Sequence, residues 1–235
     1  MILPRPTYAC NAGQSIHHRE VTMAMQDCLR ERINALGGDV AVATPRDALE
    51  LLLATQLPFP LYPAPRDTPW ARADEQEPIF GISEFIAAHP AHAANDRAAL
   101  LRDVQAHYYA PTEELRGQVE FRLQRFTPFL EGSDDYIEWA GGDDFDSAYL
   151  AEITGHATPE FLFIGFSEGY PNHHFVCVAD AGELNPPVYS TDHEQYLSDI
   201  TRRGSLREWL ASFMTPAELL QRVNDALDRD NPPSV

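Results

Sequence analysis

The stretch FLFIGFSEGYPNHHFVCVAD, residues 161–180, determines the fold class that we predict for this chain. FLFIGF is an unbroken apolar run, and HFVCVAD is rich in valine and phenylalanine, so both runs are typical of buried strands. Gly169, Pro171 and Asn172 lie between the runs and favour a turn. We therefore expect two neighbouring strands joined by a turn, with PPVYSTD, residues 186–192, as a third strand.

The same stretch contains a G-x-S-x-G pattern, residues 165–169, which presents the nucleophilic serine in many hydrolases. Such an elbow requires a helix after the serine and several parallel strands before it. Here a strand follows, and the preceding sequence is mostly helical in pattern. We interpret the glycines as turn residues, and a serine hydrolase using Ser167 with His193 and Asp180 or Asp192 is kept as an alternative.

Helical periodicity flanks these strands on both sides. Thr44 and Asn95 are expected to cap helices before the strands, and Ser205 and Thr215 to cap helices after them. A proline-rich segment, residues 57–70, is expected to be extended or to form a boundary. Apolar spacing predicts helices in residues 17–38, 44–57, 77–90, 94–109, 111–130, 205–214 and 215–230.

The charge balance is strongly acidic. The chain has 17 basic residues, all of them arginine, against 36 acidic residues, which gives a formal net charge of −19. Because the chain has no lysine, it cannot be a P-loop, Schiff-base or pyridoxal-phosphate enzyme of the usual kind. An acidic surface repels nucleic acid and anionic membranes, so we expect neither as a partner. A basic macromolecule is the partner that such a surface attracts, although the charge can also serve solubility alone.

The cysteine content and the N-terminal sequence indicate the cellular compartment that we expect for the protein. Three widely spaced cysteines, Cys10, Cys28 and Cys177, indicate neither a disulfide framework nor a cysteine zinc site. Pro4 and Pro6 interrupt the region where a secretory signal would be apolar, and no run approaches the ~20 apolar residues of a membrane span. We therefore expect a cytoplasmic protein with reduced thiols.

The most acidic segment is EGSDDYIEWAGGDDFDS, residues 131–147, which has seven acids and no base. Its spacing does not match an EF-hand, because no glycine stands at the required sixth position. The adjacent His173 and His174 should point to opposite faces of a strand, one buried and hydrogen-bonded and the other exposed, so they cannot easily share an ion. We expect no metal and no cofactor, and we predict a solvated acidic loop around Tyr136 and Trp139.

The order of the later motifs resembles the SUKH superfamily. The matching elements are the strand FLFIG, a glycine-containing turn, the apolar strand FVCVAD, the strand PVY followed by DHE, and the helix SLREWL, all within residues 161–214. The turn sequence EGYPNHH and the long helical region before the strands depart from the family pattern. The resemblance implies a non-enzymatic α+β fold with an antiparallel or mixed central sheet and helices packed on it. We place this domain at residues 71–235, with a helical N-terminal extension at residues 1–70.

Many SUKH-like bacterial proteins are immunity proteins, and others are regulatory interaction proteins. The resemblance and the charge together predict an immunity protein that binds and neutralises a cognate, basic toxin. Toxins that target nucleic acid are one class of such a partner. We expect the toxin to be encoded by a neighbouring gene. A regulatory scaffold without a toxin partner shares the fold and the charge and stays an alternative. The partner-binding residues that we predict are Asp134, Asp135, Tyr136, Glu138, Trp139, Asp143, Asp144, Asp146, Glu168, Tyr170, His173 and Glu194.

Overall fold

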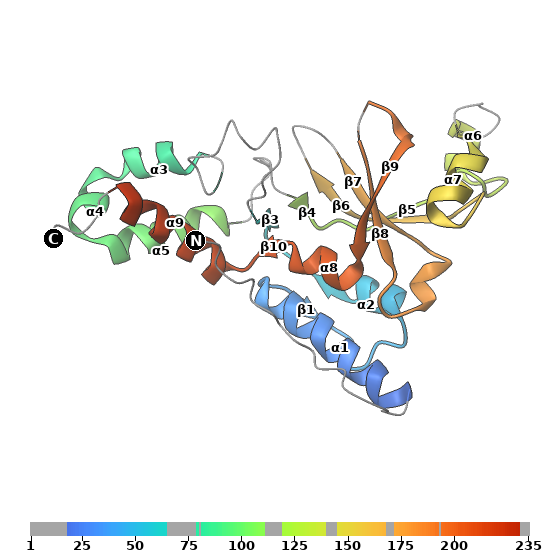
Figure 1. The fold of residues 1–235 in the computed structure, drawn as a ribbon, viewed down its shortest axis with the longest axis horizontal. Helices are drawn as coiled ribbons and strands as arrows, with labels where there is room; N and C mark the ends of the chain where they lie inside the picture. Colours follow the sequence, from blue (N-terminus) through green and yellow to red (C-terminus); the bar gives the residue numbers. More distant parts are fainter. Residues whose placement is uncertain are drawn as a thin grey trace.

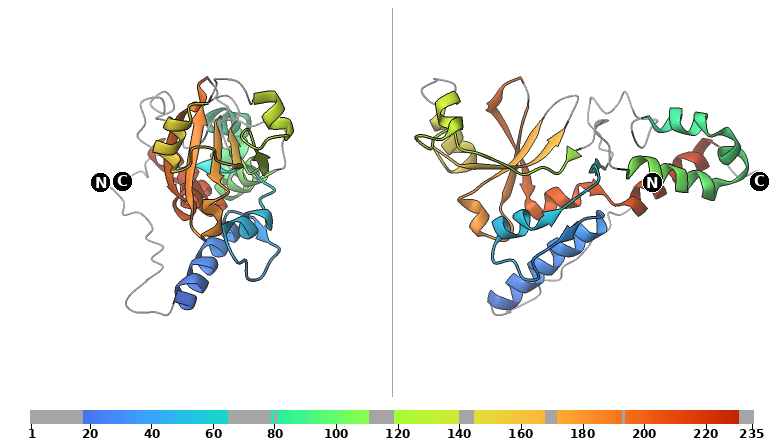
Figure 2. Two further views of the ribbon diagram at one scale, coloured as in Figure 1. Left: turned by 90° about the vertical axis from the view of Figure 1, so that its right-hand side faces the viewer. Right: turned by 180° about the vertical axis from the view of Figure 1, so that it is seen from behind.

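The computed structural model describes residues 18–64, 79, 81–110, 119–139, 145–167, 172–192 and 194–230. Within these ranges an antiparallel sheet has helices on both of its faces, and a group of further helices lies beside it (Figures 1 and 2). This arrangement confirms the predicted α+β class with a central antiparallel sheet. The helices are α1 (His18–Ala35), α2 (Ala48–Leu53), α3 (Ile82–Ala88), α4 (Pro90–Asn95), α5 (Arg97–Tyr108), α6 (Asp134–Trp139), α7 (Ser147–Thr154), α8 (Leu206–Ala211) and α9 (Pro216–Asp230).

The central sheet is built around the two apolar runs of the opening stretch. These runs form β6 (Phe161–Ser167) and β7 (His173–Cys177), which pair antiparallel as predicted. The strand order is β4-β6-β7-β8-β9, and β5 also pairs with β6. The other strands of the sheet are β4 (Val119–Glu120), β5 (Gln124–Phe126), β8 (Pro187–Asp192) and β9 (Tyr196–Ser205). Two short antiparallel pairs lie outside it: β1 (Asp39–Val40) with β2 (Thr55–Gln56), and β3 (Tyr62–Pro63) with β10 (Phe213–Met214).

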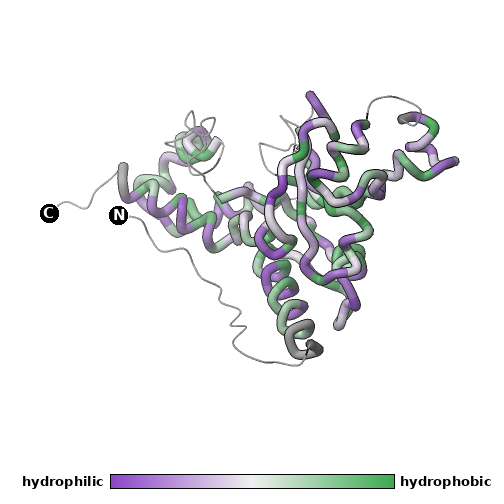
Figure 3. The backbone as a smooth tube through the Cα atoms, turned by 45° about the vertical axis from the view of Figure 1, so that its right-hand side comes forward, coloured by the Kyte–Doolittle hydropathy of each residue, from purple (hydrophilic) through white to green (hydrophobic). Residues whose placement is uncertain are grey.

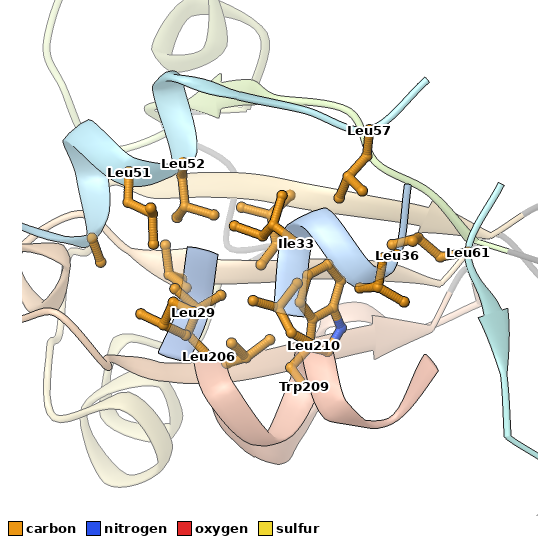
Figure 4. Packing of buried hydrophobic residues seen from close by; sticks show 14 of the residues in the cluster. Leu29, Ile33, Leu36, Leu51, Leu52, Leu57, Leu61, Leu206, Trp209 and Leu210 are labelled. Carbon is orange, nitrogen blue, oxygen red and sulfur yellow. The ribbon is translucent and has the colours of Figure 1, made fainter. Parts of the chain in front are cut away.

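Successive residues of the strands contribute to two hydrophobic cores, because side chains alternate between the faces of a sheet. On one face the side chains pack against α1, α2 and α8, as the close view in Figure 4 shows. On the other face a phenylalanine-rich core includes Leu150 of α7. The first core includes Leu29, Ile33, Leu51, Leu162, Ile164, Val176, Leu206 and Trp209, and the second includes Phe126, Phe161, Phe163, Phe175, Cys177 and Tyr189.

The N-terminal helices belong to the core of the sheet. The side chains of Leu29 and Ile33 in α1 are buried against those of Leu206 and Trp209 (Figure 4), and hydrophobic and hydrophilic residues alternate along α1 (Figure 3). Residues of α1, α2 and the segment 57–61 therefore share a core with residues of β6, β7, β8 and α8. Most of the predicted boundary near residue 70 lies outside the described residues, so the division at that position stays a prediction.

A third core joins the helices on the left of Figure 1. Leu100, Val104 and Tyr108 of α5 pack with Leu219 and Val223 of α9, and Ile82 of α3 adds to them. The hydroxyl of Tyr62 in β3 donates to the carbonyl oxygen of Tyr108 at 2.6 Å, so the short β3–β10 pair connects this helical lobe to the sheet. We call α3, α4, α5 and α9 the helical lobe.

Arg32 of α1 is the main polar contact at this connection. Its guanidinium donates to the carbonyl oxygens of Leu210 and Phe213 and lies 3.4 Å from the Glu218 carboxylate. The Arg32 side chain is only 12% exposed, which favours a fixed geometry. Arg32 thus connects α1, the end of α8 and the start of α9 through side-chain contacts.

Several local predictions are corrected by the structure. α2 is capped by Asp47 and α5 by Asp96, rather than by Thr44 and Asn95, because each aspartate accepts a hydrogen bond from the backbone of the first turn. The caps Ser205 and Thr215 are confirmed, each with a reciprocal glutamate.

Two segments have a different secondary structure from the one predicted. The described part of residues 111–130, predicted as helix, contains β4 and β5, because both segments pair with β6. The acidic segment 131–147, predicted as loop, contains α6 and the first residue of α7.

Candidate interaction surface

The balance of acidic and basic residues differs along the chain. Residues 126–201 contain no arginine or lysine, and this stretch supplies α6, α7, β6, β7, β8 and the first half of β9. α6 and α7 lie at the end of the molecule opposite the helical lobe (Figures 1 and 2). The stretch contains 15 acids: Glu131, Asp134, Asp135, Glu138, Asp143, Asp144, Asp146, Glu152, Glu160, Glu168, Asp180, Glu183, Asp192, Glu194 and Asp199.

α6 is fixed to the end of β5 by a set of side-chain hydrogen bonds. The Asp135 carboxylate accepts from the backbone N–H of Thr127 at 2.7 Å and from its hydroxyl at 3.0 Å. The Ser133 hydroxyl donates to the Thr127 carbonyl at 2.9 Å and accepts from the Tyr136 N–H at 3.0 Å. We call Thr127, Ser133 and Asp135 the α6 clasp. Asp134 and Asp135 also place negative charge in the first turn, where the helix dipole favours it.

Three acids of α6 and the residues just before it, Glu131, Asp134 and Glu138, are exposed. Two apolar side chains accompany them: Ile137 is 73% exposed and Leu130 is 60% exposed. We define these five residues as the α6 surface. Sequence patterns did not indicate Leu130 or Ile137, because an apolar residue in a short segment carries no signal of which side faces water.

Two of the predicted partner-binding acids accept hydrogen bonds from other residues of the chain. Asp135 belongs to the α6 clasp. Asp146 caps α7, where its carboxylate accepts from the N–H groups of Ala148 and Tyr149 at 2.9 and 3.1 Å. Tyr136, predicted as an aromatic anchor, is half-buried. Asp135 and Asp146 thus stabilise the starts of α6 and α7, and the partner-binding role of all three residues stays a prediction.

The remaining predicted residues are placed only in part. Glu194 is exposed between β8 and β9. The backbone of Trp139 closes α6, whereas its side chain lies outside the description. Four predicted residues lie outside the described residues altogether: Asp143, Asp144, Glu168 and Tyr170.

The two histidines of β7 contact opposite faces of the sheet, as predicted. The His173 ring lies 4.9 Å from the Phe163 ring and 5.1 Å from the Phe166 ring, centroid to centroid. Burial lowers the pKa of His173 below its ordinary value, and the positive charge of Arg122 lowers it further. The Nδ1 of His174 accepts a hydrogen bond from the Trp209 indole at 2.9 Å. The prediction that one histidine is exposed is wrong, since both are half-buried.

Ser167 has the surroundings of a strand-end residue. Its hydroxyl donates to the Asn172 carbonyl at 3.3 Å and accepts from the Asn172 N–H at 3.1 Å. The next described element is the antiparallel strand β7, whereas a nucleophile elbow continues into a helix. His193 and Gly169 lie outside the described residues. The serine geometry therefore gives no support to the hydrolase alternative.

Gly165 is present for close packing. Its φ is not positive, which corrects the expectation that it is a turn residue. A Cβ there would lie 3.0 Å from Val119 Cγ1, 3.1 Å from Trp209 Cζ2 and 3.2 Å from His174 Cβ. The strand register shifts between Phe163 and Gly165, as in a β-bulge, and Gly165 lies against the Trp209 indole.

One further polar cluster lies beside α7. His156 Nε2 and Asp180 Oδ1 are 2.9 Å apart, and the buried Cys177 lies on the neighbouring part of β7. Burial raises the pKa of the Cys177 thiol to about 12, with the negative charge of Asp180 adding to the effect. The thiol is therefore protonated near neutral pH and is a poor nucleophile.

Within the described ranges, no three His, Cys, Asp or Glu side chains are grouped so that they could hold a metal ion. Among the described helices, none combines the length and hydropathy that a membrane crossing needs. Comparisons with protein-family models, with curated proteins and with solved structures return no match for this chain. The resemblance to the SUKH superfamily therefore stays a prediction.

Proposed function

We propose that this chain is a cytoplasmic immunity protein that neutralises a basic toxin by binding it. One observation carries the proposal: the 76 residues from 126 to 201 contain 15 acids and neither arginine nor lysine, and their described part includes α6 and α7 at one end of the molecule (Figure 1). A concentrated negative field accelerates encounter with a basic protein by ~10–10³-fold. An acidic surface can also occupy a cleft that normally holds phosphate, which suits inhibition of a nuclease.

The organisation of α6 supports binding more than solubility alone. Exposed acids needed only for solubility can stand on any loop, whereas Glu131, Asp134 and Glu138 belong to a segment that the α6 clasp holds in one conformation. A surface that is ordered before binding loses less conformational entropy in the complex. A regulatory scaffold protein would use the same surface with a partner other than a toxin.

Co-expression with the product of the gene immediately upstream tests this proposal. We expect the upstream product alone to stop growth, and co-expression of this chain to restore growth through a one-to-one complex. Measuring the amount of one-to-one complex at low and high ionic strength then shows whether charge drives association. Absence of both toxicity and a complex would contradict the immunity proposal and leave the regulatory scaffold as the better account.

A further inference from the structure

The geometry points to the α6 surface as the docking site for a protein partner that presents an apolar patch bordered by arginine or lysine. Leu130 and Ile137 are the anchors that we infer, and Glu131, Asp134 and Glu138 are the charged border. This inference rests on the proposed function, because it names the contact surface and the chemistry that the partner must have.

The exposure of the two anchors contrasts with that of their apolar neighbours. Phe126 is buried in the second core of the sheet, and Phe129 and Phe145 pack against the same core. The side chains of Leu130 and Ile137 are 60% and 73% exposed, although Phe129, the residue before Leu130, packs against that core. Two large exposed apolar side chains on one short, hydrogen-bonded segment can form the apolar centre of an interface.

The anchors stand on a fixed support. The Leu130 N–H donates to the Thr127 carbonyl at 3.1 Å, and the Ile137 N–H donates to the Ser133 carbonyl at 3.0 Å. Thr127 and Ser133 are themselves members of the α6 clasp. A backbone held in this way loses little freedom on binding, and a few anchor side chains supply most of the affinity of an interface.

The charge around Leu130 and Ile137 indicates which class of macromolecule can bind there. Residues 126–201 contain no arginine or lysine that could neutralise Glu131, Asp134 or Glu138 from within the same stretch. A second copy of this chain would place the same acids against each other across a two-fold axis, which is unfavourable. Nucleic acid and anionic membrane are repelled for the same reason. A basic protein surface with an apolar centre is the occupant that satisfies both the anchors and the acids.

The test uses two probes and one set of variants of the full chain. The anchor variants are Ile137→Ser and Leu130→Ser, and the matched control is Leu53→Ser, because Leu53 on α2 is 61% exposed and lies outside the acidic stretch. The first probe is the purified upstream gene product. The second probe is a short synthetic amphipathic helix with leucines on one face and arginines beside them, and its counterpart with glutamates replacing the arginines is the negative control.

With the upstream product we expect Ile137→Ser and Leu130→Ser together to raise Kd roughly tenfold or more, and Leu53→Ser to change it about twofold or less. With the arginine peptide we expect amide chemical-shift changes centred on residues 130–138, reduced in the anchor variants. Wild-type-like binding of the toxin by the anchor double variant would overturn the inference while leaving the immunity function intact.

A failure of the immunity proposal gives a different result. If the upstream product neither binds nor is neutralised, the peptide still reports on the surface. Shifts centred on residues 130–138 then support the docking surface for another basic partner, whereas shifts elsewhere, or none, overturn it. Self-association of the wild-type chain that Ile137→Ser abolishes would also overturn it, since the occupant would be a second copy.

Discussion

Gly165 lies where β6, β7 and α8 converge, and its missing side chain allows the Trp209 indole to pack on the sheet. Gly165→Ala should destabilise the fold by about 1–3 kcal/mol, because the added methyl would overlap Trp209, Val119 and His174. Gly182→Ala is the control, since a Cβ at Gly182 meets nothing within 4 Å. Urea unfolding measures both changes. Equal stability of the two variants would refute the packing role of Gly165.

His173 makes stability depend on pH. Burial and Arg122 lower its folded-state pKa, so the unfolded chain, with a pKa near the ordinary 6.5, binds more protons just below that value. The contribution of neutral His173 to the free energy of unfolding should therefore be fully present above about pH 6.5, and the free energy of unfolding should fall as the pH drops toward the lowered pKa. His173→Phe should flatten this part of the curve and keep the ring contacts with Phe163 and Phe166. Unfolding curves with an unchanged slope in that window would count against this assignment.

At the scale of single elements, α6 depends on its clasp. Asp135→Ala removes the acceptor of two Thr127 hydrogen bonds, so residues 130–139 should exchange their amide hydrogens faster, with global stability reduced by about 1–2 kcal/mol. Asp134→Ala is the matched control, because the neighbouring Asp134 is exposed. Hydrogen exchange read by mass spectrometry distinguishes the two variants. Similar exchange in both would show that the α6 clasp does not hold the helix.

Arg32 is the corresponding contact between elements. Arg32→Met should cost about 1–3 kcal/mol, because the carbonyl oxygens of Leu210 and Phe213 lose a buried donor. Arg46→Met should leave stability nearly unchanged, since the Arg46 side chain is 83% exposed and surface ion pairs contribute little. Thermal or urea unfolding provides the comparison. A cost for Arg32→Met as small as that for Arg46→Met would contradict the proposed connection.

Local signals predicted some elements and could not predict others. The capping boxes at Ser205 and Thr215 are encoded within four residues each, so α8 and the start of α9 were predictable. Val119, Leu123 and Phe126 have helical spacing, and only pairing with β6 makes strands of that segment. β9 was missed because its surface residues Ser198, Asp199 and Thr201 are polar, as is common in an edge strand.

At the scale of the whole molecule, the sequence indicated the acidic segment but could not indicate its geometry. Charge is a property of composition, so the predicted site included Asp134 and Glu138, which are exposed. Exposure is a property of the tertiary fold, so the hydrogen bonds that Asp135 and Asp146 accept from neighbouring residues and the exposure of Leu130 and Ile137 required the structure.

The central claim is that the acidic end of the molecule captures a basic protein. The most direct measurement is the association rate between this chain and the upstream gene product, followed by stopped-flow fluorescence at increasing ionic strength. We predict fast association that slows steeply with salt, and a further decrease when Asp134→Asn and Glu138→Gln are combined, with Asp27→Asn and Glu31→Gln on α1 as the control pair. No association, or a rate that neither salt nor the α6 variants change, would contradict the account.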